Sequence, residues 1–322
     1  MEKKDLRIVY MGTPDFAVES LKALVEGGYN VVGVITMPDK PAGRGHKLQA
    51  SAVKEYALSQ NLPLLQPEKL KDDQFLEALR QWKADLQIVV AFRMLPEVVW
   101  DMPRFGTFNL HASLLPQYRG AAPINWAVIN GDRETGATTF FLTHEIDTGK
   151  IILQEKISIG EDENVGSVHD RLMQMGGKLV TRTVNTILEG KVDAVDQSAF
   201  YKDESELKAA PKIFKDTCHI DWNKDIVSIY NLIRGMSPYP AAWSELIAPD
   251  GSATGMKIFE AEKIVEPHFL QPGAIRTDGK SKLNVAAKDG FIRLKSVQLA
   301  GKKRMDIPSL LNGYKITEEY KF

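Results

Sequence analysis

Short apolar runs separated by segments of helical periodicity constrain the fold of the first half of this chain more than any other feature. Residues 6–11, 31–35 and 86–92 are strongly apolar, and the segments between them place apolar side chains three and four residues apart. Continuous apolar runs of this length are typical of strands buried on both faces, and alternating strands and helices are joined by right-handed crossovers. We therefore expect an α/β domain built on a parallel sheet.

The first strand is not followed by a nucleotide-binding fingerprint. Residues 12–16 read Gly-Thr-Pro-Asp-Phe rather than G-x-G-x-x-G, and the pattern G-x-x-x-x-G-K-[ST] occurs nowhere in the chain. Both fingerprints work by bringing backbone N–H groups close to phosphates. The sequence therefore argues against a dinucleotide or a P-loop nucleotide as cofactor.

Beyond residue 210 the pattern changes to short alternating runs, at residues 256–260, 274–277, 282–287 and 290–297, with Gly/Asp turns. Such runs indicate a small β-barrel or sandwich, and a barrel of the oligonucleotide-binding type is a plausible nucleic-acid module. A chain of 322 residues is long enough for two domains. We predict an N-terminal domain over residues 1–190, a linker over residues 191–210 and a C-terminal domain over residues 211–322.

Composition and charge narrow the class of protein. Hydrophobic residues make up 43% and charged residues 26%, as in ordinary globular proteins, and the single cysteine excludes an internal disulfide. The apolar run near the N-terminus is too short for a signal peptide or a membrane span, so we expect a cytoplasmic location. Residues 208–322 hold 18 Lys and Arg against 13 Asp and Glu, whereas residues 1–207 hold 23 against 29. A basic C-terminal part fits a polyanionic partner, although uneven scatter of surface charge explains it equally well.

A loop over residues 37–49 carries Lys40, Arg44 and Lys47 against the single acid Asp39. Long loops without secondary structure of their own are often functional. One interpretation is a mobile basic arm that reaches a phosphate backbone, and the other is a solvated loop that happens to be positive.

Polar side chains that could carry chemistry gather around residues 105–123. Residues 107–111 read as a strand, on which Asn109 and His111 project from the same face. Asn109 could donate its amide N–H to an oxyanion, His111 could do the same and then protonate a leaving nitrogen, and Asp147 could hold the ring and favour its charged form. Ser113 is adjacent, but no G-x-S-x-G elbow is present. Direct acyl transfer to an amine fits these residues better than a covalent acyl-enzyme, unless they are simply turn residues.

The same residues resemble a known family. N-L-H at 109–111, S-L-L-P-x-x-R-G-A-A-P at 113–123 and D-T-G at 147–149 are similar to motifs of the folate-dependent formyltransferases. M-G-T-P-D-F at 11–16, P-D-K-P-A-G-R-G-x-K-L at 38–48 and the second domain narrow the resemblance to members that act on methionyl-tRNA. The resemblance covers nearly the whole chain.

The resemblance implies a fold and a reaction. It implies a Rossmann-like N-terminal formyltransferase domain with a parallel sheet and a smaller C-terminal OB-like β-barrel that binds tRNA. The reaction would transfer a formyl group from 10-formyltetrahydrofolate, through a tetrahedral intermediate, to the α-amino group of methionine on initiator tRNA. No metal is implied, the six histidines show no metal-ligand spacing, and we expect a monomer. The site residues implied by the resemblance are, for catalysis, Asn109, His111 and Asp147; for folate, Ser113, Leu114, Leu115 and Pro116; and for tRNA, Lys40, Arg44, Lys47, Lys302, Lys303 and Arg304.

The sequence departs from the family pattern in two places. Residues 91–96 read A-F-R-M-L-P, one residue shorter than the Tyr-Gly loop of relatives, and Glu145 stands where a glycine is usual. Neither change replaces a catalytic side chain, so we predict that the chemistry survives both. The alternatives are transfer to a small amine, release of formate to water, and a non-catalytic RNA-binding protein; the intact Asn109, His111 and Asp147 argue against the last.

Overall fold

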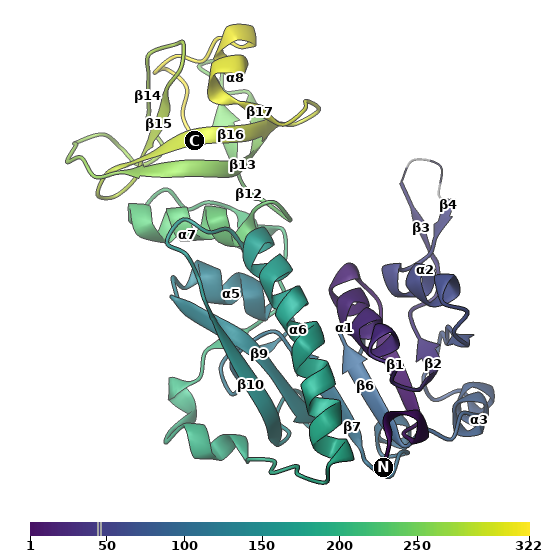
Figure 1. Ribbon diagram of the computed structural model, residues 1–322. Coiled ribbons are helices and arrows are strands. Elements are labelled where there is room, and N and C mark those ends of the chain that lie inside the picture. The colour runs from purple at the N-terminus through teal and green to yellow at the C-terminus, as the bar shows by residue number, and fades with distance from the viewer. Residues whose placement is uncertain (44, 46) are drawn as a thin grey trace. The chain divides into compact units, whose positions relative to one another are not determined.

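The computed structural model of the protein describes residues 1–43, 45 and 47–322. Two compact units make up the chain (Figure 1). Unit 1 comprises Met1–Gly120, Thr135–Ile157 and His169–Ala209, and unit 2 comprises Ala121–Glu134, Ser158–Val168 and Ala210–Phe322. The domain boundaries at residues 190 and 210 stay a prediction.

Unit 1 is built on a seven-stranded sheet with the order β10-β9-β7-β6-β1-β2-β5. Strand β1 pairs in parallel with β2 and β6, β2 with β5, and β6 with β7, whereas β9 runs antiparallel to β7. The α/β fold with a mainly parallel sheet is thus confirmed. The strands are β1 (Ile8–Gly12), β2 (Val31–Ile35), β5 (Leu64–Leu65), β6 (Leu86–Val90), β7 (Thr107–His111), β9 (Glu134–Phe141) and β10 (Ile151–Ser158).

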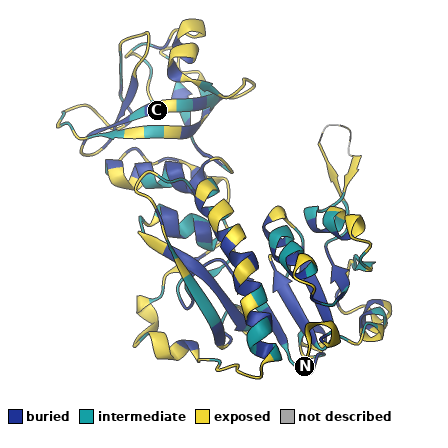
Figure 2. Cartoon of the chain, viewed as in Figure 1, coloured by how far each residue is buried: buried dark blue, intermediate teal, exposed yellow. Residues whose placement is uncertain are grey.

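Helices pack on this sheet through the apolar stripes that the sequence predicts. Helix α3 buries Phe75, Leu76 and Leu79 in a core that includes Met11 of β1 and Val89 of β6. Figure 2 shows the central strands buried along their length, as expected for strands covered on both faces. The helices are α1 (Asp15–Glu26), α2 (Ala52–Ser59), α3 (Asp73–Gln81), α4 (Glu97–Trp100) and α6 (Val165–Leu188), with 3-10 turns η1 (Lys3–Asp5), η2 (Gln197–Phe200) and η3 (Glu204–Glu206).

Helix α6 lies directly against one face of β7. A Cβ atom on Gly176 would be 2.7 Å from Cδ2 of Leu110, so a larger residue at position 176 would require the Leu110 side chain to shift. Because side chains alternate along a strand, Leu110 faces α6 while Asn109 and His111 project from the opposite face. The packing of α6 therefore decides which face of β7 is left for a site.

The segment over residues 37–49 contains a two-stranded antiparallel ribbon, β3 (Lys40–Ala42) and β4 (Lys47–Gln49). Our expectation of a loop without secondary structure is therefore wrong for its described part. Gly43 and Gly45 both have positive φ angles, of 69° and 104°. Glycine adopts such angles without strain, so it suits the tight connection of a hairpin.

Unit 2 is a small antiparallel barrel with the strand order β12-β13-β16-β15-β14 and β17 paired to β16. The C-terminal segment closes it, because Lys321 forms bridges with both Ile247, at the end of β12, and Ala274, just before β14. The predicted C-terminal β-barrel is thus confirmed. Its elements are α5 (Pro123–Ile129), η4 (Asp216–Cys218), α7 (Ile226–Met236), β12 (Ala242–Ile247), β13 (Ala253–Ile264), β14 (Ile275–Thr277), β15 (Leu283–Ala286), β16 (Phe291–Leu299), β17 (Met305–Asp306) and α8 (Ile307–Gly313).

Two further strands of two residues each are β8 (Arg119–Gly120) and β11 (Ala209–Ala210). Among the described residues, no helix combines the length and the apolar character needed to cross a membrane.

Candidate active site

Strand β7 carries the first polar residue of the predicted site. Asn109 lies opposite Val89 of β6 and Phe140 of β9, so it is held from both sides by the sheet. Its Oδ1 atom is buried and makes no hydrogen bond within the described part of the chain. A buried polar atom without a partner is costly, and such atoms in native proteins often await a ligand. The role of Asn109 toward a substrate stays a prediction.

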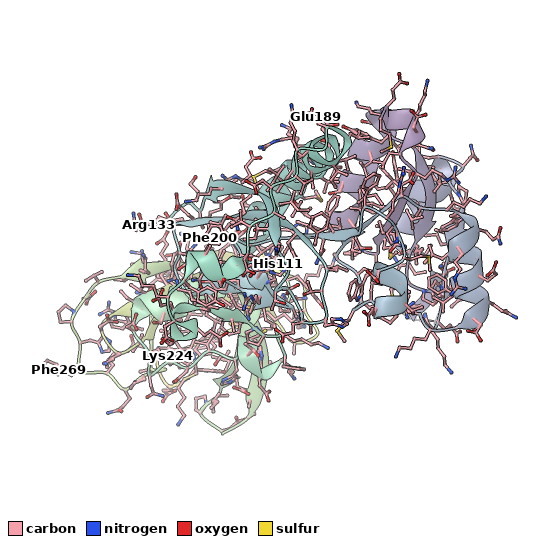
Figure 3. All side chains as sticks on the ribbon, turned by 90° about the horizontal axis from the view of Figure 1, so that it is seen from below. His111, Arg133, Glu189, Phe200, Lys224 and Phe269 are labelled. Carbon is pink, nitrogen blue, oxygen red and sulfur yellow. The ribbon has the colours of Figure 1, made fainter. Side chains whose placement is uncertain are left out.

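His111 ends β7 with its side chain 8% exposed. Its Nε2 lies 2.8 Å from the carbonyl oxygen of Tyr118. Because a carbonyl oxygen only accepts, Nε2 carries the hydrogen and donates it, and Nδ1 is the nitrogen that faces the carboxylate of Asp147. The ring stands edge-on to Phe140, with centroids 6.4 Å apart. Figure 3 labels His111 among the side chains drawn as sticks.

Asp147 lies in the turn between β9 and β10 and brings its carboxylate to the end of β7. Its Oδ2 accepts a hydrogen bond of 2.9 Å from the backbone N–H of Gly120 and lies 3.8 Å from Nδ1 of His111. That separation is longer than a hydrogen bond but within the range of an electrostatic pair. Gly120 has a φ angle of 127°, which favours glycine. The sheet and this turn therefore bring Asn109, His111 and Asp147 to the carboxyl-terminal end of β7.

The glycine two residues after Asp147 is required for steric reasons. A Cβ atom on Gly149 would overlap the carbonyl oxygen of Phe141, so the returning chain can pass β9 only with glycine at this position. Asp147 itself has a left-handed φ angle of 57°, which is unfavourable for a residue with a side chain. The turn is thus a constrained one.

Gln197 is a residue of this site that the sequence did not identify. It is 2% exposed, and its Nε2 donates hydrogen bonds of 2.8 Å to the carbonyl oxygens of both Asp147 and Gly149. Its Oε1 accepts from Nε and Nη2 of Arg119, at 3.1 and 2.8 Å. The only signal in the sequence was a single glutamine in a polar segment, which looks like any linker residue.

The residues predicted to line the folate site form a tight turn after β7. Ser113 is fully buried and its hydroxyl donates to the carbonyl oxygen of Gln117 at 2.6 Å. Leu115 is 1% exposed, Pro116 is buried and Leu114 is half-buried. Their side chains are thus largely used within the protein, and their contact with folate stays a prediction.

The two departures from the family pattern lie in surface segments. Arg93, in the shortened segment at residues 91–96, donates to the carbonyl oxygens of Pro67 and Glu68, and burial lowers the pKa of its guanidinium. Glu145 is exposed, and its carbonyl oxygen accepts from the hydroxyl of Thr148 at 3.1 Å. Neither departure falls on Asn109, His111 or Asp147.

Among the predicted tRNA-binding residues of unit 1, Lys40 and Lys47 are exposed on the β3–β4 ribbon, and Arg44 lies outside the described residues. Asp39 is occupied by Lys54, whose ammonium lies 2.8 Å from its Oδ2. This hydrogen bond, helped by Gln66, lowers the pKa of Asp39. Asp39, the one acid of the segment, is thus neutralised by Lys54 just before β3, and the ribbon keeps the positive charges of Lys40 and Lys47.

In unit 2, Lys302 and Lys303 are exposed in the turn after β16. Arg304 is held more closely: it pairs with Glu260 at 2.9 Å, donates to Oγ of Ser296 at 2.8 Å and covers the ring of Phe259. No group of three or more His, Cys, Asp or Glu suited to a metal ion occurs within residues 1–43, 45 and 47–322.

Comparisons with known proteins bear on both units. Residues 6–184 match the family model described as formyl transferase, and residues 212–315 match the model described as formyl transferase, C-terminal domain. The methionyl-tRNA formyltransferase of Parabacteroides distasonis is 70% identical over 321 residues, which cover 99% of each chain.

Two solved structures share the fold at low identity. HypX from Aquifex aeolicus in complex with tetrahydrofolic acid is 18% identical with a TM-score of 0.61; the match covers 95% of this chain but 46% of HypX. An N-formyltransferase from Helicobacter canadensis, in complex with folinic acid and dTDP-3-aminofucose, is 18% identical with a TM-score of 0.63 and is covered over its full length by 93% of this chain.

Proposed function

Because this chain belongs to the formyl transferase family, we propose that it transfers the formyl group of 10-formyltetrahydrofolate to the α-amino group of methionine on initiator methionyl-tRNA. The observation that carries the proposal is the 70% identity to a methionyl-tRNA formyltransferase over 99% of both chains. That identity extends through both units of the chain. The low-identity neighbours, one of them bound to an amino sugar nucleotide, support the fold alone.

The side chains at the end of β7 fit a formyl donor. When bound, 10-formyltetrahydrofolate supplies a formyl group on a nitrogen that must leave as an amine. Asn109 offers an amide whose Oδ1 has no partner within the described chain, and His111 offers one ring nitrogen that is not used by the backbone. An amide and an imidazole are the groups that acyl transfer without a covalent intermediate requires.

Asn109 acts on the formyl group. Its Nδ2–H donates to the formyl oxygen as negative charge develops there.

The α-amine attacks the formyl carbon, the bond from that carbon to the folate nitrogen breaks, and His111 passes the proton that the amine gives up to the leaving nitrogen. Its Nε2–H is committed to the carbonyl of Tyr118, so Nδ1 is the nitrogen that holds a proton for the leaving nitrogen. Oδ2 of Asp147, at 3.8 Å, stabilises the positive charge on the ring while it holds that proton. Gly120 N–H keeps the carboxylate in place. We expect the loss of either Asn109 or His111 to cost on the order of 100- to 1000-fold in rate.

The experiment follows labelled formyl from 10-formyltetrahydrofolate to charged initiator methionyl-tRNA, beside uncharged tRNA. The wild-type protein, His111→Ala and His144→Ala are compared; His144 is a matched control because it is exposed and lies in the same turn as Asp147. Transfer to charged tRNA alone, lost in His111→Ala and kept in His144→Ala, is the expected result.

The other outcomes separate the alternatives. Formate released without an acceptor would identify a hydrolase. Transfer to a small amine that survives high salt and does not need tRNA would identify a small-acceptor enzyme. Tight tRNA binding without either product would identify a non-catalytic RNA-binding protein. Sedimentation of the protein and its fractionation from cells test two further parts of the proposal, that it acts as a monomer and in the cytoplasm.

A further inference from the structure

The barrel of unit 2 contains a cavity of about 650 Å³ that the transfer reaction does not use. Its walls come from residues 213–218, from residues 239–243 leading into β12, and from facing parts of β13 and β16. A cavity of this size is in the range that takes a nucleotide-sized ligand. All of its lining residues belong to unit 2, so the cavity is complete within the barrel.

The cavity includes an outward-facing row of three side chains across three strands. Trp243 of β12 pairs in register with Lys257 of β13, which pairs with Gln298 of β16. Residues directly opposite one another in a sheet project from the same face, about 5 Å apart. Their neighbours Met256 and Leu299 point instead into the core of the barrel. An indole, an ammonium and an amide therefore stand side by side on the outer face.

Two further aromatic side chains stand at this cavity. Phe214 is 62% exposed and Tyr239 is 82% exposed, although both rings are large and largely apolar. Trp243 also lines the cavity and is held in place: its Nε1 donates to the carbonyl oxygen of Lys215 at 2.9 Å, and the Lys215 ammonium lies 4.9 Å from the centroid of its ring. Exposed aromatic rings gathered around one cavity are the usual platform on which unstacked bases lie.

The charge of the cavity is positive. Lys215 and Lys257 are the only charged residues among those that line it, and both are exposed. Glu245, two residues after Trp243, is occupied by a hydrogen bond of 2.7 Å with His219, which lowers the pKa of its carboxyl. Lys302 and Lys303 follow directly on Gly301, the last residue of the wall. The ligand that matches this surface combines a planar ring with an anion.

Covalent chemistry is not indicated here. Cys218 lines the cavity, but burial raises the pKa of its thiol, and the thiol donates to the carbonyl oxygen of Phe214 at 3.5 Å. A thiol in this state is a poor nucleophile. The lining residues therefore favour non-covalent binding over covalent chemistry.

We propose that this cavity binds one unstacked nucleotide of the tRNA substrate, with the base against Trp243, Phe214 and Tyr239 and its flanking phosphates on Lys215 and Lys257. The inference rests on the proposed function, because the nucleotide belongs to the acceptor of that reaction. A stacked base in a duplex cannot enter a cavity, so the site selects an unpaired position of the tRNA. It adds an aromatic contact to a predicted recognition surface otherwise made of lysines and arginines.

The test measures the dissociation constant of the full-length protein for methionyl-tRNA by fluorescence anisotropy at several salt concentrations. Phe214→Ala and Tyr239→Ala should each raise the Kd about tenfold, the usual effect of losing one stacked base. Lys257→Gln should reduce the slope of log K against log salt by about 0.7–0.9, as for one phosphate contact. All three side chains are exposed, so their replacement leaves the barrel folded.

Matched controls lie on the same unit away from the cavity lining. The controls are Phe269→Ala and Lys280→Gln. Phe269 is fully exposed and is labelled in Figure 3, and Lys280 is exposed in the turn before β15. Both should leave Kd and salt slope unchanged. Ultraviolet crosslinking of bound tRNA to the wild-type protein should place a single unpaired nucleotide on residues 214, 239 or 243.

Two results would overturn the inference while the proposed function stands. One is normal formyl transfer and tRNA binding in all three cavity variants. The other is equal weakening by the cavity and control variants, which would indicate general surface contact. The proposed function fails instead if the wild-type protein neither binds nor formylates methionyl-tRNA. If that protein then binds adenosine monophosphate at millimolar concentration and Tyr239→Ala does not, the cavity serves a free nucleotide.

Discussion

Gln197 donates a hydrogen bond of 2.8 Å to the carbonyl oxygen of Asp147, a residue 50 positions earlier in the chain. The bond holds the backbone of a residue that has a left-handed φ angle of 57° and whose carboxylate faces His111. A second bond from the same amide to Gly149 fixes both ends of the turn. Gln197 is therefore a positioning residue for the carboxylate, and it contacts neither ring nitrogen of His111.

Replacing this glutamine should lower turnover. Gln197→Leu leaves two buried carbonyl oxygens and Arg119 without their partner, so we expect a loss of about 1–3 kcal/mol in the free energy of unfolding. The displaced carboxylate should lower kcat about 10- to 100-fold, with little change in the KM for tRNA. Steady-state kinetics well below the melting temperature and denaturant unfolding measure the two effects. The exposed Gln60→Leu is the control; a less stable Gln197→Leu with normal kcat would show that Gln197 is only structural.

Asn109→Ala should separate activity from stability. Oδ1 of Asn109 makes no hydrogen bond in the described part of the protein, so its removal should leave the free energy of unfolding unchanged or slightly higher. The formyl transfer rate should fall about 100- to 1000-fold, because the developing oxyanion loses its amide donor. Denaturant unfolding and single-turnover kinetics on the same preparation check both. A variant that is destabilised and still active would contradict this role.

Gly149→Ala should disrupt the turn that carries Asp147. The added Cβ would overlap the carbonyl oxygen of Phe141, which belongs to the backbone and cannot move aside. We expect a loss of about 1–3 kcal/mol, as for an overpacked site, and a fall in kcat. Gly313→Ala is the control, since nothing lies within 4 Å of its added Cβ. Thermal unfolding compares the two variants, and equal melting temperatures would refute the steric argument.

The two lysines of the β3–β4 ribbon should contribute electrostatically to tRNA binding. Lys40→Gln combined with Lys47→Gln should reduce the slope of log K against log salt by about 1.4–1.8, as for two phosphate contacts. Turnover of a saturated enzyme should change little, because neither lysine lies on the strand that carries the site. Lys71→Gln, exposed elsewhere on unit 1, serves as control. An unchanged slope in the double variant would mean that the ribbon is merely solvated.

Glu145→Gly should change turnover by less than about tenfold, that is, by less than about 1.4 kcal/mol in the activation free energy. The Glu145 side chain is exposed, and only its backbone carbonyl takes part in the turn, through Thr143 and Thr148. Kinetics of the two proteins at equal tRNA and folate concentrations test this. A gain of tenfold or more would show that the extra carboxylate inhibits the site.

The sequence predicted the parts of the fold that depend on local pattern. The apolar run at residues 31–35 and the strand predicted at residues 107–111 coincide with β2 and β7, because a strand has a short, distinct period. The ribbon at residues 40–49 was missed, since its glycines indicated only a break in the pattern. Residues 191–210 are polar, which is why the sequence predicts a linker there; within this segment Val195 bridges to Ile151 and Gln197 is buried, and the linker bounds stay a prediction.

What the sequence determined by itself is the kind of chemistry: an amide and an imidazole two residues apart on a strand, a later carboxylate, and a basic C-terminal part. What only the tertiary structure decided is how these groups meet. The pairing of His111 Nε2 with Tyr118, the distance from Nδ1 to Asp147 and the support from Gln197 all depend on how separate segments pack. The row of Trp243, Lys257 and Gln298 likewise depends on strand register. Periodicity is a property of a few consecutive residues, whereas register and close packing are set by the whole fold.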